Sequence, residues 1–216
     1  MKNFIIAGKY AFGPLGVKEA EEKRVKDLKD VLMRPLESDE VLYRVYRGVL
    51  FEPHYDLRID VTRLKSKVLE DGELARTHGH YHPEGPFGTW PEIYGVIKGR
   101  AVFILQDLGG KDVRLVEVRE GEYVVIPPGY GHVMVNVGNN ELLTFNVVSS
   151  SFKPSYKEYK EKRGPAVYLL EGLEVKYNPN YKVRSVKWCK PLRVPEVKRF
   201  SYHAYKPPLE EWLLCE

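Results

Sequence analysis

Cysteine is scarce in this chain of 216 residues, and long apolar runs are absent. The two cysteines, Cys189 and Cys215, are far apart and neither belongs to a CxxC pair. This spacing argues against a disulfide framework or a cysteine metal site, and it suits a reducing compartment. No stretch of 18 apolar residues occurs, and the apolar run near the N-terminus is too short for a signal peptide. These absences predict a soluble, cytoplasmic protein with no membrane partner.

The sequence also lacks the signatures of nucleic-acid binding, since it has no helix-turn-helix pattern, zinc-finger spacing or RNA-binding aromatic motif. The formal net charge is a modest +4, from Lys+Arg 34 against Asp+Glu 30. The surplus is uneven, because residues 151–216 carry fourteen Lys/Arg, eight Glu and no Asp, a net +6. A basic surface can attract phosphorylated ligands, but a solvated face is the simpler interpretation. We therefore expect no nucleic-acid partner.

The pattern of short elements predicts an all-β fold of the jelly-roll type. Val17–Leu32 shows apolar residues at helical spacing most clearly, and Pro35 follows it, so a helix is expected there. Turn signals rich in Gly and Pro then separate a series of short strands, which is typical of a β-sandwich or barrel. The expected strands are Val41–Arg47, Leu57–Leu64, Thr77–His82, Ile93–Lys98, Ala101–Gln106, Val113–Val118, Glu122–Ile126, His132–Asn136 and Leu142–Val148.

The length favours one domain in three segments. Residues 1–40 form a helical segment that packs on the barrel, and residues 41–150 form the barrel with its site. Residues 151–216 form an extension, with expected strands at Ala166–Leu170 and Val183–Trp188, that lies on the barrel or on a partner subunit.

Three histidines and one glutamate form the candidate metal site. His80 and His82 stand two apart, and residues i and i+2 of a strand face the same side. Glu92 begins the next strand, and His132 opens a later strand after the turn Pro127-Pro128-Gly129. Four such ligands leave two octahedral positions for substrate oxygens or water, and the N/O set suits Fe(II), Mn(II), Ni(II) or Zn(II).

The other three histidines have lesser expected roles. His78 precedes His80 by two residues, so it is expected to contact a ligand or face the substrate. His54 and His203 lie outside any motif and are expected to be ordinary structural or surface residues.

Two motifs connect the chain with a known family. The spacing Gly121-x5-Pro127-Pro128-Gly129-x2-His132-x3-Asn136 matches the second cupin motif, and His80-x-His82 with Glu92-x6-Gly99 matches the first. Glu92 comes ten residues after His82, a longer spacing than in most cupins. With the strings Thr77-His78-Gly79-His80-Tyr81-His82 and Pro91-Glu92-Ile93-Tyr94, the chain resembles the cupin-type glucose-6-phosphate isomerases of archaea, from about residue 35 to residue 182.

The resemblance implies a cupin double-stranded β-helix, a jelly-roll barrel, that binds one divalent metal per subunit, Fe(II) foremost. It implies His80, His82, Glu92 and His132 as metal ligands. Thr77 and Gly79 would hold a sugar phosphate, with Tyr43 and Thr62 as further partners, and Tyr94 and Tyr156 would line the substrate. Glu92, assisted by Tyr94, would carry out catalysis, and a homodimer is expected. The chain departs from the family pattern at Gly129-Tyr130 and at Pro154.

The implied activity is interconversion of glucose 6-phosphate and fructose 6-phosphate, in glycolysis and gluconeogenesis. Three alternatives stay open from the residues: an isomerase of another sugar phosphate such as mannose 6-phosphate, an Fe(II) cupin dioxygenase, and a non-catalytic sugar-binding cupin.

Overall fold

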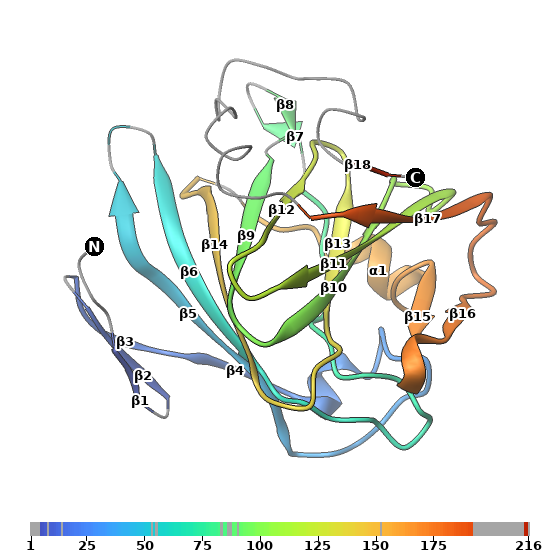
Figure 1. Ribbon diagram of the computed structural model, residues 1–216, viewed down its shortest axis with the longest axis horizontal. Helices are drawn as coiled ribbons and strands as arrows, with labels where there is room; N and C mark the ends of the chain where they lie inside the picture. The colour runs from blue at the N-terminus through green and yellow to red at the C-terminus, as the bar shows by residue number, and fades with distance from the viewer. Residues whose placement is uncertain are drawn as a thin grey trace.

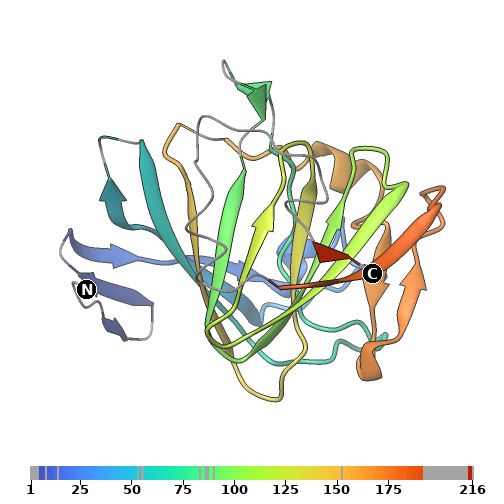
Figure 2. The same ribbon diagram turned by 45° about the horizontal axis from the view of Figure 1, so that its top comes forward.

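The computed structural model describes residues 5–7, 9–13, 15–52, 54, 56–82, 84–85, 88–89, 91–151, 153–191 and 214–215 (Figure 1). Two larger sheets curve around a shared interior, and the all-β class predicted from the sequence is confirmed (Figure 2). Among these residues, no helix is both long enough and apolar enough to cross a bilayer.

The first large sheet has six strands in the order β12-β9-β14-β6-β5-β4. The second has five, in the order β13-β10-β11-β17-β18. Their bounds are β4 Glu21–Arg24, β5 Val41–Glu52, β6 Leu57–Leu64, β9 Glu92–Lys98, β10 Arg100–Gln106, β11 Asp112–Arg119, β12 Tyr123–Ile126, β13 Gly131–Asn136, β14 Leu142–Ser149, β17 Ser185–Lys190 and β18 Leu214–Cys215.

Smaller elements flank this pair of sheets. Strands β1 to β3 form a separate three-stranded sheet beside β5, and β7 and β8 form a short hairpin (Figure 1). The bounds of these elements are β1 Ile5–Ala7, β2 Tyr10–Gly13, β3 Gly16–Glu19, β7 Glu84–Gly85 and β8 Gly88–Thr89. After β14 come α1 Lys157–Glu161, β15 Val167–Leu169, the 3₁₀ helix η3 Glu171–Leu173 and β16 Val175–Tyr177.

The core lies between the two large sheets. One cluster of buried apolar side chains joins residues of both, among them Phe103 from β10, Val125 from β12 and Val133 from β13. Each side chain of this size contributes about 1.5–3 kcal/mol when it is fully removed from water. The turn Pro127–Tyr130, with Gly129 at φ 83°, carries the chain from β12 in one sheet to β13 in the other. His132, the second residue of β13, therefore lies in the other sheet from Glu92 on β9.

The predicted helix Val17–Leu32 is wrong. The structure has β3 and β4 there, followed by the 3₁₀ helix η1 Val25–Leu28. Strand β4 pairs with β5, and its glutamates meet arginines of that strand: Glu22 lies 2.7 Å from Arg44. Tertiary pairing has overridden the local helical pattern. The apolar residues in its second half still face inward: Val25, Leu28, Val31 and Leu32 are all buried.

The predicted strand Thr77–His82 is also wrong as a regular strand. The segment makes two isolated bridges instead, His80 with His132 and Tyr81 with Ser155, and Arg76 just before it bridges Val135. The remaining expected barrel strands are found within a few residues of their predicted limits.

The segment after residue 151 contributes to the barrel wall. The expected strands at 166–170 and 183–188 correspond to β15 and β17, and β17 pairs in parallel with β11. Cys189 on β17 is disulfide-bonded, so the expectation of no disulfide is wrong. Cys215, the other cysteine of the chain, lies opposite Cys189 in the β17–β18 register. The two cysteines are 26 residues apart in the sequence, and only the pairing of β17 with β18 brings their backbones together.

Candidate metal centre

The bridge between His80 and His132 places two of the predicted ligands side by side. The His80 N–H donates to the carbonyl of His132 at 3.2 Å, and the His132 N–H donates back at 3.1 Å. Gly79 allows this approach, since its φ is +82° and a Cβ there would lie 2.5 Å from Val133 Cγ2. Any other residue would strain the backbone and push the bridge apart. The local chain path therefore depends on glycine.

Glu92 lies at the centre of the cluster. Its Oε2 is 3.1 Å from His82 Nε2, 3.4 Å from His132 Nε2 and 3.8 Å from His80 Nε2. The ligand atoms of all four residues lie within 4.8 Å of one another. The planes of the His80 and His82 rings are nearly parallel, and their centroids are 5.3 Å apart. Four donors thus converge on one point, as the coordination of a single ion requires.

The second oxygen of Glu92 is held by an amide. Asn146 Nδ2 donates to Glu92 Oε1 at 2.6 Å, and both side chains are buried. Strand register explains the contact, because Asn146 on β14 lies opposite Tyr94, two residues beyond Glu92 on β9. The amide orients the carboxylate so that Oε2 points at the imidazoles.

Burial favours the neutral imidazoles of His80 and His132. It lowers the pKa of His80 well below its usual value, and the neighbouring His132 and His82 rings add to the effect. Burial also lowers the pKa of His132 well below its usual value. A metal ion binds the unprotonated nitrogen of a neutral imidazole. A histidine that is already neutral releases no proton when the metal binds, so binding is more favourable near neutral pH. The donor chemistry of this cluster therefore fits a divalent metal ion.

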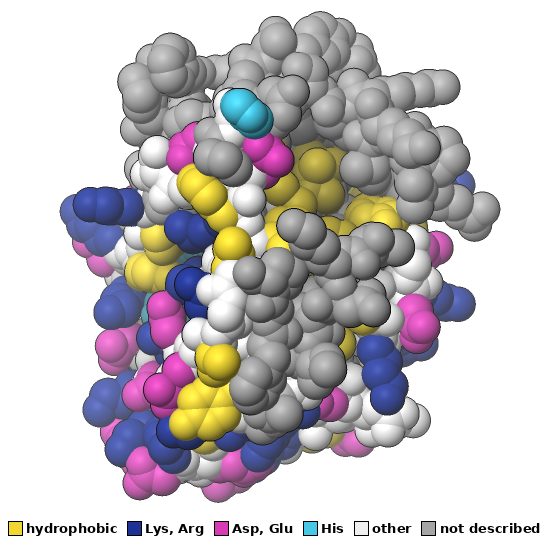
Figure 3. Space-filling view, turned by 90° about the vertical axis from the view of Figure 1, so that its left-hand side faces the viewer, with side chains coloured by type: hydrophobic (Ala, Val, Ile, Leu, Met, Phe, Trp, Pro, Cys, Tyr) yellow, Lys and Arg dark blue, Asp and Glu magenta, His cyan; other side chains and the backbone are white. Residues whose placement is uncertain are grey.

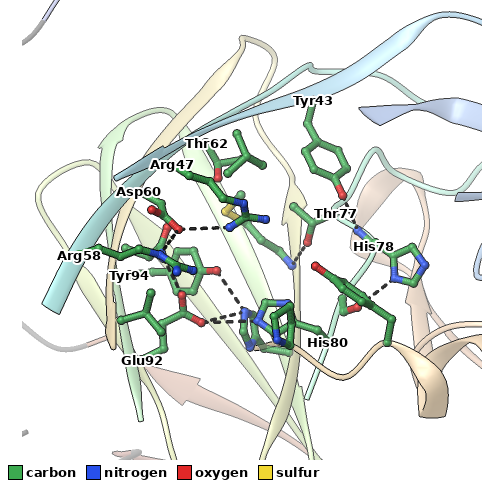
Figure 4. A pocket seen from close by; sticks show the side chains of 18 residues that line it. Tyr43, Arg47, Arg58, Asp60, Thr62, Thr77, His78, His80, Glu92 and Tyr94 are labelled. Carbon is green, nitrogen blue, oxygen red and sulfur yellow. Dashed lines mark hydrogen bonds and ion pairs between the residues drawn. The ribbon is translucent and has the colours of Figure 1, made fainter. Parts of the chain in front are cut away.

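A cavity of ≈ 270 Å³ opens beside the cluster (Figure 4). Every residue that the sequence predicted for substrate binding or catalysis lines it, as do three of the four ligands; His82 lies behind them, buried against Glu92. The predicted residues on the cavity wall are Tyr43, Thr62, Thr77, Gly79, His80, Glu92, Tyr94, His132 and Tyr156.

Two wall hydroxyls are oriented by backbone donors. The Met134 N–H donates to Thr77 Oγ1 at 3.1 Å, and the His78 N–H donates to the Tyr43 hydroxyl at 3.3 Å. Each oxygen therefore accepts from the protein and keeps its own O–H for a ligand. Tyr94 lies with its hydroxyl 3.1 Å from His132 Nε2.

The remaining histidines differ in their placement. His78 lines the cavity and packs edge-on against Tyr156, with ring centroids 5.0 Å apart. Burial lowers its pKa to about 4. His54 is exposed, and His203 lies outside the described residues.

Sequence reasoning missed four polar residues of the cavity: Arg47, Arg58, Asp60 and Asn146. The first three follow from period-2 alternation, since Arg47 is four residues beyond Tyr43 on β5, and Arg58 and Asp60 precede Thr62 on β6 by four and two. With Tyr43 and Thr62 on the cavity wall, this alternation predicts that Arg47, Arg58 and Asp60 face the cavity as well. Asn146 carries no such signal, because only the pairing of β14 places it.

The lowered histidine pKa values predict how the metal-free protein depends on pH. When folding lowers the pKa of a histidine, the folded protein binds fewer protons at that site than the unfolded chain does, at pH values between the two pKa values. For His78, the stabilisation is fully present above pH 6.5 and declines as the pH falls towards about 4. We expect the free energy of unfolding, measured with urea after EDTA treatment, to fall over this range.

The variant His78→Gln should reduce that slope by up to about 1.4 kcal/mol per pH unit. His54→Gln, a change at an exposed histidine, should leave the slope as in the wild type. Equal slopes for His78→Gln and the wild type would contradict the assignment of His78 as a buried neutral imidazole.

Fold and site together define an all-β barrel with a candidate metal centre in its cavity. The glucose-6-phosphate isomerase (GPI) family model matches residues 22–184. The glucose-6-phosphate isomerase of Thermococcus onnurineus is 30% identical over 172 residues, which cover 74% of this chain and 86% of that protein. A putative glucose-6-phosphate isomerase 1 of Rhizobium meliloti is 30% identical over 178 residues, covering 76% and 80%. The chain belongs to the glucose-6-phosphate isomerase family.

Similarity to solved structures is partial. An oxalate oxidase matches 50% of this chain and 51% of its own, at 24% identity and a TM-score of 0.39. The family assignment therefore rests on the sequence matches.

Proposed function

We propose that the protein is a metal-dependent aldose–ketose isomerase that interconverts glucose 6-phosphate and fructose 6-phosphate. The observation that supports this best is a single cavity lined both by three residues of the candidate metal cluster and by Tyr43, Thr62 and Thr77, which carry hydroxyl groups. A sugar phosphate needs these two environments at its two ends. Membership of the family supports the same reaction.

The proposed cofactor is one divalent ion per subunit, Fe(II) foremost, with Mn(II), Ni(II) and Zn(II) suited to the same donors. His80, His82, Glu92 and His132 would hold it. When bound, the ion supplies positive charge that stabilises the negative charge developing on the sugar oxygens O1 and O2.

The cavity wall that carries Tyr43, Thr62, Thr77 and Gly79 would bind the phosphate group. Thr77 and Tyr43 already accept backbone N–H groups, so their hydroxyl hydrogens are available to phosphate oxygens. Thr62 and the Gly79 amide would add further donors. Tyr156, which lies against His78, would line the carbon chain of the sugar.

Glu92 would move the proton between C1 and C2 of the open-chain sugar. The Asn146 amide holds Glu92 Oε1, which limits rotation of the carboxylate. Tyr94 would donate to a substrate oxygen, because burial and the Glu92 carboxylate hold its pKa well above the usual value and keep its hydroxyl protonated. A carboxylate that also binds metal is a weak base, so proton transfer by Glu92 competes with a hydride shift in which Glu92 serves only as a ligand.

We propose in addition a cytoplasmic homodimer in which residues 1–40, 41–150 and 151–216 act as one unit. Strand β4 forms one edge of the six-stranded sheet, and a sheet edge is stabilised when a partner covers it. On the face shown in Figure 3, acidic and basic side chains are mixed, as on an ordinary solvated surface.

A coupled assay tests the proposal: conversion of fructose 6-phosphate to glucose 6-phosphate before EDTA, after EDTA, and after adding back Fe(II), Mn(II), Ni(II) or Zn(II). We expect EDTA to abolish turnover and at least one metal to restore it. No activity with any of these metals would refute the isomerase. Activity with mannose 6-phosphate alone, oxygen uptake, or sugar-phosphate binding without turnover would instead identify one of the three alternatives.

A further inference from the structure

Two arginines project into the same cavity beside the phosphate wall. Tyr43, Val45 and Arg47 alternate along one face of β5, and Arg58, Asp60 and Thr62 alternate along the adjacent face of β6. Figure 4 shows Arg47 reaching from β5 towards the centre of the pocket, with Arg58 and Asp60 next to it. No motif of the sequence included these residues.

A buried carboxylate holds the two guanidinium groups together. Asp60 Oδ2 is 3.2 Å from Arg47 Nη1 and 3.2 Å from Arg58 Nε, while Asp60 Oδ1 accepts the Gly48 N–H at 2.7 Å. Asp60 is only 1% exposed, so it cannot swing into solvent and release them. The two arginines share this one buried carboxylate, and the half-exposed Glu21 also pairs with Arg47. A single buried anion thus fixes a cationic pair at the cavity wall.

Arg47 keeps donors for a ligand. Its Nε pairs with Glu21 at 2.8 Å and one Nη1 hydrogen faces Asp60, which together use two of its five N–H groups. The Glu21 side chain is half exposed, so solvent screens much of its electrostatic attraction to Arg47. Within the described part of the chain, these two are the only carboxylates within 4 Å of Arg47.

The position of Arg47 relative to the wall tyrosines indicates which ligand group it meets. Burial raises the pKa of Tyr156, and the nearby Arg47 guanidinium opposes that rise. Burial likewise raises the pKa of Tyr43, and Arg47 again acts in the opposite direction. Arg47 lines the same cavity as both tyrosines, of which Tyr43 belongs to the proposed phosphate wall and Tyr156 to the part that would line the carbon chain.

We infer that Arg47, held by Asp60 beside Arg58, binds the dianionic phosphate of the substrate and selects sugar phosphates over neutral sugars. The inference rests on the proposed function. Hydroxyl and amide donors alone accept neutral and charged oxygens alike, whereas a guanidinium binds a phosphate through charge-assisted and often bidentate hydrogen bonds. Arg58 strengthens the local positive potential that attracts the anion.

The test compares Arg47→Ala with Arg44→Ala in the metal-loaded enzyme. Arg44 lies on the same strand and is also ion-paired, to Glu22, but it does not line the cavity. We expect Arg47→Ala to raise the KM for fructose 6-phosphate about 10- to 100-fold with kcat changed less than about threefold. Arg44→Ala should leave both parameters near the wild-type values.

Calorimetric titration with sorbitol 6-phosphate and sorbitol, which differ only by the phosphate, provides a readout without turnover. Arg47→Ala should weaken binding of sorbitol 6-phosphate by a similar factor and leave that of sorbitol unchanged. If Arg47→Ala does not fold, Arg47→Lys and Arg58→Ala replace it, and each should raise the KM several-fold, about 3- to 10-fold.

The outcomes separate the two proposals. A wild type that isomerises fructose 6-phosphate, together with an Arg47→Ala variant that keeps its KM within about twofold, overturns the role of Arg47 and leaves the proposed function intact. A metal-loaded wild type that neither isomerises fructose 6-phosphate nor binds sorbitol 6-phosphate overturns both.

Discussion

His132→Ala should yield a folded protein that neither retains the metal nor isomerises fructose 6-phosphate. His132 Nε2 lies 3.4 Å from Glu92 Oε2, and a backbone bridge fixes His132 beside His80. Removing this imidazole leaves two nitrogens and one carboxylate, and alanine offers no donor in its place. Changing even a partner of a ligand costs 10- to 100-fold in metal affinity, so we expect a loss of more than about 100-fold for the ligand itself.

The metal content of the purified variant, measured by elemental analysis, and the coupled assay check this expectation together. His54→Ala is the matched control, because it removes an exposed imidazole far from any motif and should change neither quantity. Thermal unfolding of the metal-free forms shows whether the barrel is intact. An active His132→Ala enzyme without metal would remove His132 from the set of ligands.

Glu92→Gln should reduce turnover by about 10²–10⁴-fold, the range that a positioned acid or base contributes. The glutamine keeps the size of the side chain and an acceptor for the Asn146 amide at the Oε1 position. It removes the negative charge that faces the three imidazoles, so metal affinity should fall as well. Glu141→Gln, a change at a residue paired with Arg63 on the surface, should leave both unchanged.

Turnover at saturating metal separates the two effects. If excess metal restores wild-type kcat in Glu92→Gln, Glu92 is a ligand and does not carry the proton. Isotope transfer in the wild type addresses the same question: deuterium from solvent appearing at C2 supports the proton route, and complete retention of the substrate hydrogen supports a hydride shift.

The two motifs were sufficient to predict which four residues form the candidate metal cluster, because each motif is a local pattern. The turn before His132 and the His80-x-His82 spacing are read within a few residues, and the structure brings these ligands within 4.8 Å of one another and of Glu92. The expected strand at 77–82 was wrong in detail, since Gly79 adopts a positive φ, yet bridges to β13 still place His80 beside His132.

The N-terminal error has a different cause. Residues 17–32 have an apolar pattern that fits a helix, but their charged residues fit a second arrangement, in which Glu22 on β4 pairs with Arg44 on β5. The intrinsic preferences of these residues for helix or strand differ by only small free energies. Pairing of β4 with the long strand β5 outweighs that difference. The pattern was therefore informative about burial and misleading about conformation.

The sequence by itself determined the all-β class, most of the barrel strands, the four candidate ligands and the family, because strand alternation, turns and motifs depend on residues that are close in sequence. Only the tertiary structure decided that Asn146 holds Glu92, that Asp60 joins Arg47 to Arg58, and that Cys189 lies opposite Cys215. Except for the Asp60–Arg58 pair within β6, these contacts join different strands. Their existence depends on register, and a shift of one residue would turn every one of those side chains to the other face of its sheet.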